Sequence, residues 1–255
     1  MKVYDRENYI KEGSILKKLL LKLFKSNDKL TVLDIGGCEG EESIRYSNLF
    51  PKSTIFIFEP LPANQMLINR NIIEHKKLNI KLIAKAVSDH DSLEKFYISS
   101  GQPNIENKLD WDFGNKSSSL LMPKIKNNPE WLKFKDEIMV NTITIHSFFE
   151  EYCIKIVDFA HIDVQGAELK VLYGAKKRLK NIKALWLEVA DIELYKNQVL
   201  RPEIELFMRS NNFYLVKSEM TGKVGDQFYI NKKYFHIFPF FNSGIFFKKK
   251  INVNN

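Results

Sequence analysis

The sequence predicts an α/β protein with a mostly parallel sheet, helices on both faces and an antiparallel closing strand. Three observations predict this fold. Short β-rich runs alternate with helix-length segments from Leu30 onward, glycines cluster directly after the first run, and the runs at 213–217 and 226–231 form a closing pair. Strands that alternate with helices form βαβ units with right-handed crossovers, and these units build a parallel sheet.

The first predicted element is a helix from Ile15 to Phe24, where apolar residues recur at three- and four-residue spacing behind Ser14 as an N-cap. We expect it to cover the sheet, with a helix on a membrane surface as the alternative. The other predicted helices are 41–49, 62–76, 146–152, 167–179 and 202–209. The predicted strands are 31–35, 54–58, 79–87, 137–144, 157–163, 183–189, 213–217 and 226–231.

The alternation stops between about residues 99 and 137, where glycine, proline and asparagine interrupt every period. Trp111, Phe113 and Trp131 supply large apolar side chains in the same segment. Long loops in compact domains are usually lids or binding loops. We therefore predict an ordered cover that faces the substrate, with a mobile excursion as the alternative.

No internal repeat or linker divides the chain, so one domain is predicted over residues 1–255. Residues 1–29 form its helical N-terminal cover, residues 99–137 the insertion, and residues 232–255 an aromatic and basic C-terminal tail. That tail could touch a membrane peripherally, contact a second subunit in a homodimer, or pack on the body of its own domain.

Composition excludes several classes of protein. With 255 residues, 44% of them hydrophobic and 27% charged, the chain is typical of a soluble globular protein and not of a disordered or fibrous one. Two cysteines, no signal peptide and no apolar run of membrane-spanning length indicate a cytoplasmic location. The net charge of +8 favours anionic partners, although scattered lysines usually form a solvated surface.

The segment after the first strand carries the main chemical signal. Asp34 lies in that strand, and Gly36, Gly37 and Gly40 form the turn into the next helix. Glycines let the backbone approach a ligand closely, and open α/β sheets bind ligands at the carboxyl ends of their strands. Glu59 ends the second strand, where a carboxylate can accept both hydroxyls of a ribose.

Two classes of cofactor use this geometry. A dinucleotide fingerprint needs Gly-x-Gly-x-x-Gly to seat a pyrophosphate, but here two glycines are adjacent and Asp34 would repel that group. Asp34 instead suits the positive charge of S-adenosylmethionine. The spacing D-x-G-x-x-x-G is similar to the first motif of class I methyltransferases.

Further motifs carry a resemblance to one family. They are Phe-Ala-His-Ile-Asp-Val-Gln-Gly-Ala-Glu at 159–168, Leu-Trp-Leu-Glu-Val at 185–189, Glu-Leu-Tyr-Lys at 193–196, Ser-Ser-Ser-Leu at 117–120 and Gly-Asp-Gln-Phe-Tyr-Ile at 225–230. Over about residues 31–232 the chain resembles the FkbM family of S-adenosylmethionine-dependent O-methyltransferases. The family more often has Glu at the position of Gln165 and Lys at that of His161.

The resemblance implies a Rossmann-like class I methyltransferase fold and S-adenosylmethionine as the cofactor. It also implies methyl transfer to a hydroxyl, often on a sugar of a surface polysaccharide or capsule. We expect the cofactor to contact the glycine-rich turn and the strand ends, at Asp34, Gly36, Gly37, Gly40, Glu59, Pro60, Ala86, Val87, Asp163 and Gln165.

Methyl transfer requires alignment of donor and acceptor, exclusion of water, and removal of the proton of the acceptor hydroxyl. The candidate catalytic residues are Asp163 and Glu188, at the ends of strands that the methyltransferase order makes neighbours, and His161 on the same face as Asp163. A satisfied core residue is the alternative for His161. Glu168 suits the first turn of a helix.

Asp163 and Glu188 would repel each other unless they share a proton or bind a cation. Mg²⁺, Mn²⁺ or Fe²⁺ would suit these ligands and would lower the pKa of the acceptor hydroxyl. This metal site is the alternative to direct base catalysis by Asp163.

For the acceptor, we expect a small-molecule sugar, nucleotide-linked or lipid-linked, and no nucleic acid. Ser117, Ser118 and Ser119 would orient it, and Trp111 would stack on it. An NAD(P)-dependent sugar oxidoreductase and a non-catalytic cofactor-binding subunit of the same fold are the competing hypotheses.

Overall fold

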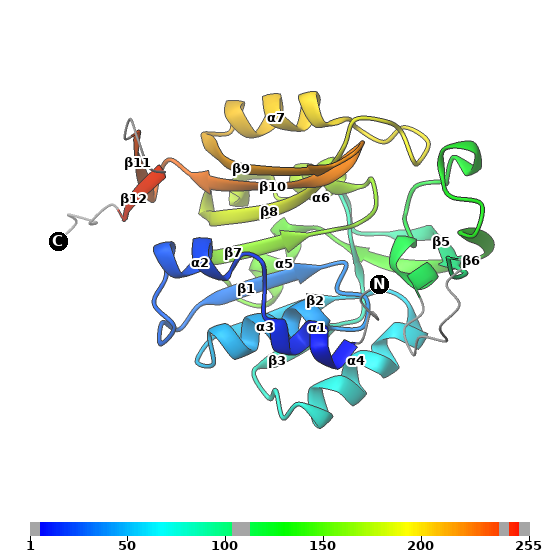
Figure 1. Ribbon diagram of the computed structural model, residues 1–255, viewed down its shortest axis with the longest axis horizontal. Helices are drawn as coiled ribbons and strands as arrows, with labels where there is room; N and C mark the ends of the chain where they lie inside the picture. The colour runs from blue at the N-terminus through cyan, green and yellow to red at the C-terminus, as the bar shows by residue number, and fades with distance from the viewer. Residues whose placement is uncertain (1–5, 104–112, 240–244, 250–255) are drawn as a thin grey trace.

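The computed structural model describes residues 6–103, 113–239 and 245–249. Its main sheet has seven strands in the order β3-β2-β1-β7-β8-β10-β9. Neighbouring strands are parallel except at β10, which runs antiparallel to both β8 and β9. The predicted mixed sheet with an antiparallel closing strand is therefore confirmed, and Figure 1 shows the helices on its two sides.

The elements have the following bounds. The strands of the main sheet are β1 (Thr31–Ile35), β2 (Thr54–Phe58), β3 (Ile80–Ile83), β7 (Val157–Ile162), β8 (Ile182–Ala190), β9 (Phe213–Thr221) and β10 (Val224–Asn231). The α-helices are α1 (Arg6–Glu12), α2 (Lys17–Leu23), α3 (Glu41–Leu49), α4 (Pro62–Glu74), α5 (Ile145–Glu151), α6 (Glu168–Gly174) and α7 (Arg201–Ser210). Short 3₁₀ helices are η1 (Phe113–Ser117), η2 (Ile125–Asn127) and η3 (Lys176–Asn181).

Two hydrophobic cores lie on opposite faces of the sheet. One joins the sheet to α5, α6 and α7 and includes Phe148, Leu172 and Met208. The other joins it to α2, α3 and α4 and includes Leu20 and Ile68. Nearly continuous apolar strands are expected when both faces of a parallel sheet are covered, and β1 and β2 are buried in this way.

The N-terminal segment contains two helices where the sequence predicted one. Leu16 and not Ser14 is the N-cap residue of α2, although Ser14 Oγ accepts a hydrogen bond from the Leu16 N–H at 3.2 Å. Leu20 and Leu23 are buried against the sheet, as the sheet-covering interpretation requires. The helix α1 was not predicted.

The predicted strand 79–87 was wrong in one respect, because it is two strands in two sheets. β3 belongs to the main sheet, whereas β4 (Ala86–Val87) pairs with β6 (Lys133–Ile143). β6 in turn pairs with β5 (Leu93–Ser100), a strand that the sequence did not predict. Figure 1 shows β5 and β6 beside one end of the main sheet. The insertion at 99–137 is therefore mostly the connection between the two strands of this hairpin, and it carries η1 and η2.

The C-terminal tail returns as a second hairpin of β11 (Phe235–Pro239) and β12 (Ile245–Lys249). Phe235 is buried with Phe24 of the N-terminal cover, so the tail begins by packing on the body of the chain. The side chains that follow Phe235 lie outside the described residues. In the described part of the chain, no helix is both long and apolar enough to cross a bilayer.

Candidate active site

The predicted site residues come together at the carboxyl edge of the main sheet because the central strands are parallel and in register. Asp34 of β1 pairs with His161 of β7, and His161 pairs with Trp186 of β8. Paired residues on neighbouring strands project from the same face. Two cavities open at this edge, and Gly36, Cys38, Lys116 and Asp163 line both of them.

The glycine-rich turn is shaped by close contacts with β2 and β7. Gly36 has a φ of +86°, and a Cβ atom there would lie 1.8 Å from the Asp163 carbonyl oxygen, so only glycine fits. A Cβ on Gly37 would lie 2.2 Å from the Ile57 side chain. Gly40 is the N-cap residue of α3 and lines neither cavity. The glycines thus let the turn pass close to the neighbouring strands.

The first cavity lies between the turn, β2, β4 and the insertion. Seven of the predicted cofactor residues line it, namely Gly36, Glu59, Pro60, Ala86, Val87, Asp163 and Gln165. Phe96 and Leu120 extend its apolar wall. Such a wall beside a few polar groups is typical of small-molecule sites.

Glu59 is the buried carboxylate of the first cavity, with 4% of its surface exposed. Its Oε1 accepts a hydrogen bond from the Leu61 N–H at 2.8 Å. Burial raises the pKa of Glu59 to about 8, and the hydrogen bonds from Leu61, Asn64 and Cys38 offset only part of that shift. Water has little access to this buried carboxylate, so the hydroxyl groups of a ligand in the cavity would supply the hydrogen-bond donors that it lacks.

The insertion contributes to the first cavity in a way that differs from the prediction. Ser118 lines it, but Ser119 is fully buried and its hydroxyl donates to the Gln165 carbonyl at 2.7 Å. The Ser117 carbonyl accepts a hydrogen bond from the Tyr195 hydroxyl at 2.7 Å. Ser119 therefore holds the insertion against the sheet and does not orient an acceptor. Trp111 lies outside the described residues.

The second cavity lies on the face of α3. Five of the predicted residues line it, namely Asp34, Gly36, Gly37, His161 and Asp163. The remaining wall comes from residues that were not predicted as site residues, among them Tyr9, Ser14, Ile15, Leu16, Glu41, Glu42, Tyr46, Trp186 and Asp226. Burial, together with the nearby Asp163, raises the pKa of Asp226 to about 7.

Asp34 and His161 form the polar centre of the second cavity. The Ser43 hydroxyl donates to Asp34 Oδ2 at 2.6 Å, and His161 Nδ1 lies 3.6 Å from Asp34 Oδ1. The Tyr46 hydroxyl is 3.2 Å from the same imidazole nitrogen. Burial raises the pKa of Asp34 to about 6, against the opposing effects of His161 and Ser43. His161 thus has polar partners, as both a general base and a satisfied core residue would have.

Asp163 and Glu188 lie close together, as predicted, but an amide lies between them. Gln165 Nε2 donates to Asp163 Oδ1 at 2.6 Å and to Glu188 Oε2 at 3.0 Å. Burial and the neighbouring carboxylates raise the pKa of Glu188 well above its usual value. Glu188 lines neither cavity.

This arrangement bears on the metal hypothesis. Asp163, Glu168 and Glu188 place one oxygen each within 4.8 Å of one another. However, Glu168 Oε1 accepts the Val164 and Gly166 N–H groups, both at 3.1 Å. The hydrogen bonds from the Gln165 amide to Asp163 and Glu188 already offset part of the repulsion that the metal was invoked to relieve. A divalent ion is therefore not supported.

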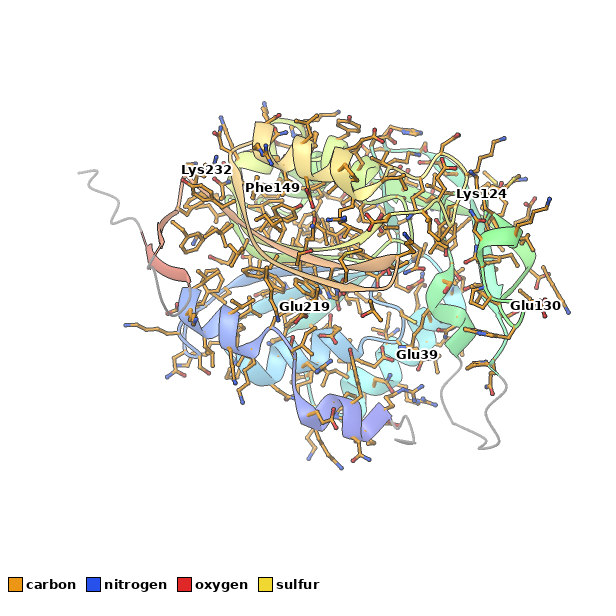
Figure 2. All side chains as sticks on the ribbon, turned by 45° about the horizontal axis from the view of Figure 1, so that its top comes forward. Glu39, Lys124, Glu130, Phe149, Glu219 and Lys232 are labelled. Carbon is orange, nitrogen blue, oxygen red and sulfur yellow. The ribbon has the colours of Figure 1, made fainter. Side chains whose placement is uncertain are left out.

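The N-terminal helix α1 closes one side of the second cavity through contacts with the glycine-rich turn and α3. Arg6 pairs with Glu39, whose Oε1 also accepts a hydrogen bond from Asn115 at 3.0 Å. The Tyr9 hydroxyl donates to Glu42, and the Arg45 guanidinium lies 4.0 Å from the Tyr9 ring centroid. Glu39, labelled in Figure 2, therefore ties α1 and the insertion to one turn.

The first cavity fits S-adenosylmethionine by the chemistry of its walls. Glu59 is a buried carboxylate that needs hydroxyl donors, and Ala86, Val87, Phe96 and Leu120 supply an apolar surface for the adenine ring. Together with the strand order and the glycine-rich turn, these residues define a class I methyltransferase. The comparisons with known proteins identify the family within that class.

The family model of the FkbM methyltransferase domain matches residues 34–215. The 2-O-methyltransferase NoeI of Sinorhizobium fredii is 30% identical over 204 residues, which cover 79% of each chain. Methyltransferase 1 of Beauveria bassiana is 25% identical over 150 residues, 58% of this chain and 59% of that protein. The solved precorrin-6y C5,15-methyltransferase of Geobacter metallireducens aligns with a TM-score of 0.43 and 14% identity, over 85% of this chain and 88% of that one.

The chain belongs to the FkbM methyltransferase family and is an S-adenosylmethionine-dependent methyltransferase. The recognition made from its motifs is therefore confirmed. Family membership also excludes the competing hypothesis of an NAD(P)-dependent oxidoreductase.

Proposed function

We propose that the chain transfers a methyl group to a hydroxyl of a sugar, nucleotide-linked or lipid-linked, during the assembly of a surface polysaccharide or capsule in the cytoplasm. The similarity to a 2-O-methyltransferase supports oxygen as the methyl acceptor. The family resemblance of the motifs supports a sugar.

One structural observation carries the proposal, namely the wall shared by the two cavities. Gly36, Cys38, Lys116 and Asp163 line both, so a ligand in the first cavity meets a ligand in the second beside Asp163. A two-substrate transfer requires this adjacency. The first cavity would hold the cofactor and the second the acceptor.

When bound, S-adenosylmethionine supplies a methyl group that its sulfonium has already activated. The residues of the chain bind, orient and deprotonate. Glu59 accepts hydrogen bonds from the ribose hydroxyls, and Gln165 fixes the carboxylate of Asp163, which orients the acceptor hydroxyl. His161 faces the second cavity and takes the hydroxyl proton as general base.

Two measurements test this proposal. Calorimetry with S-adenosylhomocysteine first establishes cofactor binding. Mass spectrometry then screens nucleotide sugars and lipid-linked sugars, incubated with S-adenosylmethionine, for the gain of one methyl group. Methylation of a sugar hydroxyl supports the proposal. Binding without turnover of any sugar would favour a non-catalytic subunit, and methylation of a different class of acceptor would exclude the sugar.

A further inference from the structure

We propose that Asp34 is a positioning residue for His161 and not a contact of the cofactor, and that it keeps the imidazole proton on Nδ1 so that Nε2 is left bare toward the second cavity. The inference rests on the proposed function, because it describes how the chain prepares the base for that reaction. It assigns to Asp34 a role different from the one that its motif suggests.

The position of Asp34 supports this role. It lines the second cavity and not the first, and only 2% of its surface is exposed. Ser43 donates to Oδ2 at 2.6 Å, and Oδ1 faces the imidazole at 3.6 Å. The adjacency is built into the sheet, because Asp34 and His161 are register partners on neighbouring parallel strands. Both carboxylate oxygens are therefore directed at groups of the chain itself.

The surroundings of Nδ1 decide which imidazole nitrogen carries the proton. Nδ1 faces the Asp34 carboxylate and lies 3.2 Å from the Tyr46 hydroxyl. A carboxylate attracts an N–H group and repels a nitrogen lone pair, most strongly where water is excluded. Ser43 supports the ionised form of Asp34 by its hydrogen bond. The tautomer with the proton on Nδ1 is therefore favoured, and Tyr46 can accept from it.

The other charged groups that the structure describes at this cavity form no hydrogen bond or ion pair with either imidazole nitrogen. Glu42 of α3, Asp163 beyond β7 and Asp226 of β10 line the cavity with His161, whereas Lys116 lies 3.2 Å from Glu41. Among the described residues, none hydrogen-bonds to His161 Nε2, and this atom is not among the buried atoms that lack a partner. Nε2 is therefore accessible from the cavity to accept a proton.

The resulting step is balanced. The acceptor oxygen forms a bond to the methyl carbon as the bond from that carbon to sulfur breaks, and the electron pair of the broken bond remains on sulfur. The hydroxyl proton moves to Nε2 while the Nδ1 proton stays in place. The imidazolium that forms faces the carboxylate of Asp34, which stabilises its charge.

Nitrogen NMR of the imidazole tests the tautomer without any acceptor. In ¹⁵N-labelled protein, His161→Gln identifies the His161 resonances by their loss. We expect Nδ1 to be protonated and Nε2 bare in the unsubstituted chain. In Asp34→Asn we expect the proton to move largely to Nε2, with Tyr46 donating to Nδ1. Tyr46→Phe should keep it on Nδ1, because the carboxylate is still present.

Calorimetry with S-adenosylhomocysteine on the same proteins separates positioning from cofactor contact. Asp34→Asn should bind within twofold of the unsubstituted chain. Asp191→Asn is the matched control, since Asp191 pairs with Arg201 at the end of β8, and it should change neither readout. Ser43→Ala removes the hydrogen bond that holds Asp34 but keeps its carboxylate, so it should move the imidazole proton only in part. This variant replaces Asp34→Asn in the test if Asp34→Asn does not fold.

A proton on Nε2 in the unsubstituted chain would overturn the inference. So would an unchanged tautomer in Asp34→Asn, or a tenfold loss of S-adenosylhomocysteine affinity in that variant. If the unsubstituted chain fails to bind S-adenosylhomocysteine, the proposed function fails, whereas the NMR result still decides the role of Asp34.

Discussion

The two cavities share a wall, but their other walls come from different parts of the chain. Every residue that lines the first cavity lies between Gly36 and Gln165, inside the segment that the family model matches. The second cavity also uses residues 9–16 and Asp226, which lie outside that segment. The segment that the family model matches therefore supplies the whole wall of the first cavity, which we propose for the cofactor, whereas the flanking segments complete the second cavity, which we propose for the acceptor.

The cavities also differ in charge. Five carboxylates line the second cavity, against Lys116 and His161, although the chain as a whole carries a net charge of +8. The carboxylates are Asp34, Glu41, Glu42, Asp163 and Asp226. Net charge is a property of the whole surface and does not predict the potential inside one cavity. The basic composition therefore says little about the acceptor.

The largest expected effect is a loss of kcat, with no loss of cofactor affinity, from a substitution in the second cavity. Gln in place of His161 removes the general base, and general-base catalysis typically contributes about 10²–10⁴-fold to a rate. We expect kcat to fall by that range, whereas the affinity for S-adenosylhomocysteine stays within twofold. Initial rates and calorimetry check both expectations. A kcat near that of the unsubstituted chain would show that another group takes the proton.

The next effect is on the cofactor side alone. Glu59→Gln replaces the carboxyl group that accepts hydrogen bonds from the ribose, and leaving a buried partner unsatisfied costs roughly 1–3 kcal/mol, or about five- to a hundredfold in affinity. Calorimetry with S-adenosylhomocysteine measures the loss. Asn64→Ala is a milder companion, because its side chain donates to the same carboxylate. Affinity unchanged in Glu59→Gln would place the cofactor elsewhere.

A smaller effect tests whether the flanking segment matters. Tyr9→Ala removes a wall of the second cavity and a donor to Glu42. Losing about 1 kcal/mol of interaction should raise the KM for the acceptor by about fivefold, with no change in S-adenosylhomocysteine affinity. Tyr214→Ala, on β9 and away from both cavities, is the control. If Tyr9→Ala and Tyr214→Ala change the KM for the acceptor equally, the N-terminal segment does not contribute to the site.

The pKa of Glu59 predicts a modest dependence of stability on pH. Because burial raises this pKa from 4.5 to about 8, the folded chain binds a proton that the unfolded chain releases. Stability from this group is full below the unfolded value and is lost as the pH rises through about 8. Glu59→Gln should therefore gain melting temperature relative to the unsubstituted chain between about pH 5 and pH 9. A constant difference across that range would contradict the assignment.

Chelation should have the smallest effect. Gln165 already bridges Asp163 and Glu188, so we expect EDTA to leave turnover within twofold of the untreated enzyme. Loss of turnover that Mg²⁺, Mn²⁺ or Fe²⁺ restores would revive the metal hypothesis. The same assay on Gln165→Glu, which replaces the amide by a third carboxylate, tests whether the amide is what makes the metal unnecessary.

Local pattern predicted the main sheet because its strands are apolar and separated by helices. The same reasoning missed β5. Phe96 is buried there, but the other hydrophobic residues of the strand are exposed or half-buried, so its sequence shows neither the two-residue period of a strand nor the 3.6-residue period of a helix. Residues 79–87 were wrongly predicted as one strand because both halves are apolar, and only the pairing of β4 with β6 separates them.

The site residues, like the strands, could be predicted only where the local sequence determines their position. Glu59 and Asp163 could be predicted because the end of a parallel strand fixes their edge of the sheet. Tyr9 and Asp226 could not, because they reach the second cavity through long-range packing that leaves no local signal. The bridging position of Gln165 depends on a φ of +54°, which the sequence does not reveal for a residue other than glycine.

The attachment of α1 has a consequence for how acceptor preference can change. Residues 6–16 contribute a wall of the second cavity, yet they contain none of the strands on which the cofactor side is built. A substitution or exchange in this short stretch alters the shape offered to an acceptor and leaves the seven-stranded sheet and its glycine-rich turn intact. Substitutions within about one helix are therefore expected to change the acceptor preference of the enzyme. Libraries for laboratory evolution should begin with these residues.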